Sequence, residues 1–109
     1  MPQLIIIGAG GHGAELDDYI RFANSINPGL NLQIEGLLDD NPASYAAYQF
    51  SAPHLGGIRD HLIRKDVEYL IGIANLQYRR LFVDQFLAAG ARFVSFIHPS
   101  ASISPRCLS

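Results

Sequence analysis

Glycines with the spacing G-x-G-x-x-G lie close to the start of this chain. Gly8, Gly10 and Gly13 have that spacing; they follow the apolar segment 4–7 and lead into a stretch with helical periodicity. A glycine turn between a strand and a helix presents backbone N–H groups and the positive end of the helix dipole, and together these bind phosphate. The motif therefore indicates a phosphate site. The alternative is a purely structural turn that needs positive φ or close packing.

Three more side chains near the predicted strand ends have the chemistry to contact a nucleotide. His12 lies inside the turn, where its imidazole either donates a hydrogen bond to a bound anion or is simply exposed. Asp39 and Asp40 end a predicted strand, where dinucleotide-binding domains place an acid for a ribose hydroxyl, although the gap from Gly13 exceeds the usual ~20 residues. We expect one carboxylate to contact the ligand and the other to begin the Asp-Asn-Pro turn.

Two side chains after a later predicted strand complete the candidate set. Asn75 either caps the next helix or forms hydrogen bonds with a base or ribose. Arg79 lies one helical turn further on, and it either reaches a phosphate or is a solvated arginine beside Arg80. The expected ligand contacts are Gly8, Gly10, Gly11, His12, Gly13, Asp39, Asp40, Asn75 and Arg79.

The hydrophobic pattern predicts alternating strands and helices that would bring these residues together. Strands are expected at 4–7, 32–38, 67–73 and 92–97, and helices at 11–24, 58–64 and 75–89. The segment 42–57 is rich in turn formers and is expected to be irregular, lying across the strand ends. Alternation of this kind predicts an α/β, Rossmann-like fold with a short parallel sheet flanked by helices. In such sheets the ligand binds at the carboxyl ends of the strands.

Composition excludes several classes of protein. The 109 residues suffice for one modest domain, and no apolar run approaches the ~20 residues that span a bilayer. The start lacks the features of a secretory signal, so a cytoplasmic location is expected, without a membrane partner. A net charge of −2 with no basic stripe argues against nucleic acid as a partner. The single cysteine and the spacing of the four histidines argue against a metal site.

The last residues change character. Two six-residue units in 97–108 each open with isoleucine and place a small residue, Ala101 or Cys107, four positions later. This is the phasing of a hexapeptide β-helix, and two units cannot close one turn. We therefore expect a Rossmann-like domain at 1–96 and the first strands of a truncated left-handed β-helix at 97–109. The alternative is a disordered tail rich in Ser and Pro.

Four ordered motifs give the sequence a resemblance to a known family. They are the segments 5–13, 36–40, 71–75 with Arg79 following, and 96–101. With these motifs the chain resembles the N-terminal domain of the hexapeptide-repeat sugar acetyltransferases, typified by sialic acid O-acetyltransferase and the UDP-bacillosamine and perosamine N-acetyltransferases. One departure is Ala74, where that family usually has glycine, and another is the apolar Leu76.

The resemblance implies a division of labour between two domains. The N-terminal domain, similar to half a Rossmann fold, would bind a nucleotide-sugar, with a UDP-sugar expected, for N- or O-acetylation in bacterial surface-glycan biosynthesis. The β-helix of the family forms trimers, binds acetyl-CoA and carries the catalytic histidine. We therefore expect the parent protein to be a homotrimeric transferase. The present chain would be a monomer or weak dimer that binds substrate without a catalytic residue of its own.

Two other functions fit parts of the pattern. An NAD(P)-binding module of a dehydrogenase or sensor would also use the glycine turn and the acidic pair, but a complete dinucleotide site needs two mononucleotide halves. A nucleotide-sensing module without chemistry would not continue into hexapeptides.

Overall fold

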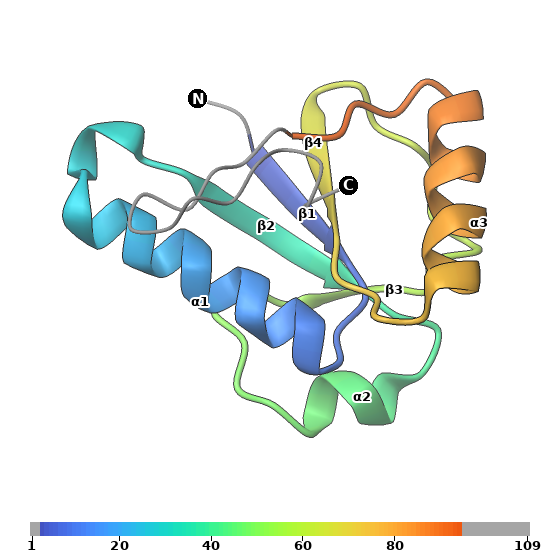
Figure 1. The fold of residues 1–109 in the computed structure, drawn as a ribbon, viewed down its shortest axis with the longest axis horizontal. Coiled ribbons are helices and arrows are strands. Elements are labelled where there is room, and N and C mark those ends of the chain that lie inside the picture. Colours follow the sequence, from blue (N-terminus) through green and yellow to red (C-terminus); the bar gives the residue numbers. More distant parts are fainter. Residues whose placement is uncertain (1–2, 95–109) are drawn as a thin grey trace.

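The structure is a computed structural model that describes residues 3–94, and Figure 1 shows their arrangement. One sheet of parallel strands has the order β3-β2-β1-β4. The strands are β1 (Gln3–Ile7), β2 (Gln33–Leu38), β3 (His54–Gly56) and β4 (Val67–Ile71). The helices are α1 (Gly11–Ile26), the 3₁₀ turn η1 (Pro28–Leu30), α2 (Pro42–Ala46) and α3 (Leu76–Ala88). This arrangement confirms the predicted α/β, Rossmann-like class.

The central strand β1 supplies apolar side chains to both faces of the sheet. Ile5 and Ile7 belong to one core cluster together with Phe82 and Phe86 of α3. Leu4 and Ile6 belong to the other cluster, which includes Ile20 and Ala23 of α1. Because successive side chains of a strand point to opposite faces, four consecutive apolar residues are what a strand covered on both sides requires. Figure 1 shows α1 and α3 separated by the strands in this way.

Parallel pairing brings the strand ends to one edge of the sheet. Ile7 at the end of β1 is in register with Leu38 of β2 and Ile71 of β4. The backbone continues this pairing by one step, since Gly8 N–H donates to the Leu38 carbonyl at 2.6 Å and Gly72 N–H donates to the Ile7 carbonyl at 2.7 Å. The glycine turn, the acidic pair and the turn after β4 therefore meet at the carboxyl edge.

Most predicted elements are present, with shifted ends. Helix α1 runs to residue 26 rather than 24, β4 stops at 71 rather than 73, and α3 ends before Gly90, whose φ is +91°. The strand expected at 92–97 is represented by one parallel bridge between Phe93 and Tyr69. The remainder of that strand lies outside the described residues.

The prediction that 42–57 is irregular was wrong. Pro42 occupies the first turn of α2, and the Asn41 side chain caps this helix by accepting the Ala43 N–H at 3.0 Å. A three-residue strand, β3, then pairs with β2 at the edge of the sheet. A helix of one turn and a strand of three residues are both too short to produce a readable period, although proline after asparagine is a recognised start signal.

The helix predicted at 58–64 does not form. Ile58 N–H donates to the Asp40 carboxylate at 2.7 Å, and Arg64 N–H donates to the Tyr69 hydroxyl at 3.0 Å. Leu62, which the helical pattern would bury, is 85% exposed. A seven-residue segment gains little from helix formation, so contacts with distant residues determine its path.

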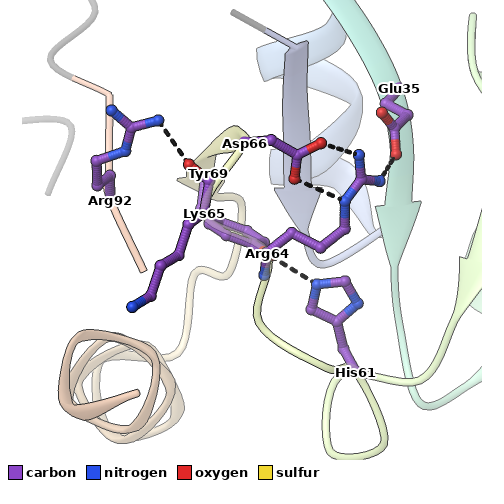
Figure 2. A network of polar contacts seen from close by, with 7 residues as sticks. All are labelled: Glu35, His61, Arg64, Lys65, Asp66, Tyr69 and Arg92. Atoms are coloured by element: carbon purple, nitrogen blue, oxygen red, sulfur yellow. Dashed lines mark hydrogen bonds and ion pairs between the residues drawn. The ribbon is translucent and has the colours of Figure 1, made fainter. Parts of the chain in front are cut away.

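Figure 2 shows the polar contacts that hold the end of this segment. The Arg64 guanidinium pairs with Asp66 at 2.7 Å and also with Glu35 of β2. His61 Nε2 lies 2.7 Å from the Tyr69 hydroxyl, and Arg92 donates to the Lys65 carbonyl at 2.8 Å. The segment is thereby fastened to β2 and β4 instead of folding on itself.

The domain boundary expected at 96 and the β-helix strands expected at 97–109, with Cys107, lie outside the described residues. Within residues 3–94, no helix has the length and apolar character needed to cross a membrane.

Candidate functional site

The N-terminus of α1 differs from those of α2 and α3. Asn41 caps α2, and Asn75 caps α3 by accepting the Gln77 and Tyr78 N–H groups at 3.0 and 3.1 Å. The N-cap of α1 is Gly10, which has no side chain to accept a hydrogen bond. The first N–H groups of a helix have no partner inside the helix, so those of α1 remain available to a ligand.

The glycines of the turn have different structural roles. Gly8 has a φ of +100°, a conformation that glycine adopts without cost. A Cβ at Gly13 would lie 2.2 Å from the Gly8 carbonyl oxygen, so this glycine lets α1 pack closely on the end of β1. A Cβ at Gly10 would meet no atom within 4 Å, and Gly11 lies against the Tyr48 hydroxyl. Of the glycines with motif spacing, Gly10 is therefore the one that faces open space.

His12 is the second residue of α1 and is exposed. Its position places an imidazole beside the N–H groups of the first helical turn. Such a side chain is able to donate to an anion bound there.

Asp39 joins the end of β2 to the glycine turn. Its carboxylate accepts the Ala9 N–H at 2.8 Å through one oxygen and the Asn41 N–H at 2.8 Å through the other. The second bond is the turn interaction expected of one member of the acidic pair. The first shows that Asp39 also fixes the path of residues 8–10.

Asp40 holds the segment that follows β3. One oxygen accepts the N–H groups of Ile58 and Arg59 at 2.7 and 3.3 Å, and the other accepts from Arg59 Nε at 3.2 Å. Both carboxylates of the pair therefore organise backbone around the strand ends.

A crevice of about 260 Å³ lies between these segments and α3. Its lining includes Gly8, both aspartates, Arg59, and the aromatic residues Tyr78 and Phe82. Tyr78 is half exposed, and its ring stacks with that of Phe82 at 6.4 Å between centroids. A concave site with aromatic walls and a few polar groups is typical of small-molecule binding.

Of the predicted site residues, Gly8, Asp39 and Asp40 line this crevice, whereas Asn75 and Arg79 do not, and neither do Gly10, Gly11, His12 and Gly13. The Asn75 oxygen is engaged as the cap of α3, as one of the two predicted roles requires. Arg79 lines a separate groove along α3 with Arg80 and Asp84. Ala74 and Leu76, where the chain departs from the pattern of the resembled family, are both exposed.

Sequence analysis missed Arg59 and Tyr78 as crevice residues. Arg59 follows β3, the strand that was not predicted, so its position at the sheet edge was not foreseeable. Tyr78 lies one turn into α3, and its spacing from Phe82 was compatible with a core position. Within residues 3–94 no group of three or more His, Cys, Asp or Glu side chains is placed to hold a metal.

A comparison with curated proteins gave no significant match. A comparison with protein families gave one, the PglD N-terminal domain, which covers residues 3–86. The match includes the glycine turn, the acidic pair, β4 and most of α3. The chain therefore belongs to the PglD N-terminal domain family, the N-terminal domain of PglD-type UDP-bacillosamine acetyltransferases.

Proposed function

We propose that this domain binds the nucleotide part of a nucleotide-sugar, with the phosphates on the N-terminus of α1. The observation that carries the proposal is the absence of a side-chain cap on α1, with Gly10 open, while Asn41 and Asn75 cap the other two α-helices of residues 3–94. Family membership supports a sugar acetyltransferase as the parent protein.

The nucleoside would lie on the α3 side of the crevice beside the turn, which leaves the side at Gly8 for the phosphates. Tyr78 offers an exposed aromatic face for a base, and the aspartates border the place where a ribose would bind. We propose a UDP-sugar as the ligand, because the family model is named for enzymes that act on one.

The proposed reaction of the whole protein is acetyl transfer from acetyl-CoA to an amino or hydroxyl group of the sugar, in surface-glycan synthesis in the cytoplasm. The sugar nitrogen or oxygen would attack the thioester carbonyl, a new amide or ester would form, and the thiol of CoA would leave. No group within residues 3–94 is assigned to this step. Acetyl-CoA, the catalytic base and trimer contacts are proposed to belong to a β-helix domain.

An NAD(P)-binding module is the second candidate, because the glycine turn and acid also occur there. One observation disfavours it. The four strands of residues 3–94 make one mononucleotide half, whereas a dinucleotide site uses two.

Calorimetric titration of the chain with UDP and with NAD⁺ in parallel separates these functions. We expect UDP to bind with a stoichiometry of about one, as a single site implies, and NAD⁺ to give no heat. Binding of NAD⁺ without UDP would overturn the proposal. If neither UDP nor NAD⁺ bound, the proposal would also be contradicted, since the α1 site lies wholly within this chain.

A further inference from the structure

Arg59 is held in the crevice by contacts on two sides. Its Nε donates to Asp40 at 3.2 Å, and its guanidinium carbon lies 5.9 Å from the centre of the Phe82 ring. The side chain is nonetheless 66% exposed, and its two Nη groups donate to no described residue. A guanidinium fixed in this way loses little freedom when a ligand binds.

The other charged side chains around the strand ends are negative, so Arg59 matters for binding an anion. The glycine turn brings no arginine or lysine, only the imidazole of His12, because the first arginine of the sequence is Arg21 and its single lysine is Lys65. Asp39 and Asp40 add two negative charges at the same edge. Among the described residues that line the crevice, Arg59 is the one with a permanent positive charge.

This imbalance matters for an anionic ligand. A diphosphate that approaches the α1 N-terminus would meet both carboxylates, and like charges repel. The helix dipole supplies only about half a positive charge. A guanidinium beside Asp40 offsets one carboxylate and still has donors for phosphate oxygens.

We propose that Arg59 is a ligand-binding residue that donates to the phosphate groups and determines the preference of this site for nucleotides over nucleosides. The inference rests on the proposed function and assigns a specificity role to a residue outside the glycine and acidic motifs. We assign the Arg59 contact to phosphate and not to a base edge because of the hydrogen-bonding character of the guanidinium. A guanidinium has only donors, and phosphate oxygens are only acceptors, whereas base edges mix both.

The test compares uridine, UMP and UDP by calorimetry on the wild-type chain and on Arg59→Gln, Arg59→Lys and Arg21→Gln. Arg21 is a matched control because it is 59% exposed and also donates to a single aspartate, Asp18. Thermal unfolding of each variant checks that the fold is kept.

Arg59→Gln should weaken UDP binding about tenfold, the usual order for a charge-assisted hydrogen bond, and leave uridine binding within about twofold. Arg59→Lys should restore part of the loss, because the positive charge remains. Arg21→Gln should bind like wild type.

Three results would overturn the inference. Equal UDP affinity in wild type and Arg59→Gln would exclude a role for the arginine while leaving the nucleotide site intact. An equal loss for uridine and UDP would place the contact on the nucleoside instead. If the wild-type chain bound none of the three ligands, the proposed function itself would fail, and this inference with it.

Discussion

At the scale of single residues, the glycines of the turn are needed for different reasons. Gly13 allows close packing of α1 on β1, and Gly10 leaves open space before the helix. Gly13 and Gly8 meet because α1 must pack on the end of β1, and a Cβ at Gly13 would overlap the Gly8 carbonyl. Gly10 has extended backbone, with φ −87° and ψ −158°, and open space where its Cβ would be. Packing explains Gly13 without a ligand, whereas nothing in the described residues requires glycine at position 10.

Alanine substitutions separate these requirements. Gly13→Ala should lower the free energy of unfolding by roughly 2 kcal/mol or more, because backbone must move to remove the overlap. Gly10→Ala should leave it unchanged or raise it by about 0.5 kcal/mol, because alanine restricts the unfolded chain. Gly10→Ala should nonetheless weaken UDP binding, since its methyl group enters the space before the helix N–H groups. Urea denaturation and calorimetry measure the two effects.

The opposite pattern would contradict these roles. A strongly destabilised Gly10→Ala variant would mean that the turn is closed by contacts within the protein. Full UDP affinity in a stable Gly10→Ala variant would place the phosphates elsewhere.

The residue types at the site were predictable from the sequence, but their partners were not. Glycine spacing after an apolar strand indicated the glycine turn, and Asp-Asn-Pro indicated a turn after β2, although the Asn41 N–H donates to Asp39 and not to Asp40. The bond from Ala9 to Asp39 joins residues 30 positions apart, so it depends on the pairing of β1 with β2. Local sequence carries no signal for such a contact.

At the scale of elements, the cap of α3 bears directly on the role of Asn75. Its side-chain oxygen accepts two backbone N–H groups, which leaves the α3 N-terminus closed. Asn75→Ala should therefore cost about 1 kcal/mol of stability, as is usual for loss of an N-cap. Asn75→Ser should keep most of the stability, because serine also caps.

Both Asn75 variants should bind UDP with wild-type affinity if capping is the whole role of the residue. Thermal denaturation and titration of the pair decide this. A loss of affinity in the stable Asn75→Ser variant would show that the amide also contacts the ligand.

The segment 57–66 contains a histidine whose charge state affects stability. Burial lowers the pKa of His61 and raises the pKa of Tyr69. The Tyr69 hydroxyl accepts the Arg64 N–H and lies 2.7 Å from His61 Nε2, in a part-buried pair whose burial disfavours a charged imidazole. The folded state thus favours the neutral ring.

The sign of the pH dependence follows. Below the ordinary histidine pKa of about 6.5, the unfolded chain binds a proton that the folded chain resists, so stability falls as the pH is lowered. Urea denaturation between about pH 7 and 5 should show a steeper loss for wild type than for His61→Gln. His12→Gln, which changes an exposed histidine of α1, is the matched control variant. Identical slopes for wild type and His61→Gln would contradict the assignment.

Elements with several turns were predictable, and short ones were not. The sixteen residues of α1 and the apolar run of β1 have clear periods. Helix α2, strand β3 and the segment 58–64 are set by a cap, by pairing with β2 and by the Asp40 carboxylate. These interactions involve residues distant in the sequence or single side chains, so they cannot be predicted from hydrophobic periodicity.

At the scale of the whole molecule, the parallel sheet brings motifs that are far apart in the sequence together at one edge. The order β3-β2-β1-β4 places β1 in the middle, so the segments after β2 and β4 flank the glycine turn. Fold class and family were predictable because motifs in order carry them; the parallel sheet confirms the class, and the match over residues 3–86 confirms the family. The crevice was only partly predictable, because one of its walls follows the missed strand β3.

The central claim is that the first turn of α1 binds phosphate, and amide NMR tests it most directly. In a titration of ¹⁵N-labelled chain with UDP, the largest shifts should belong to the N–H groups of Gly10, Gly11, His12 and Gly13. The Gln77 amide at the capped start of α3 should retain its bond to Asn75 and move less. Shifts centred on another surface, or none at saturating UDP, would contradict the account.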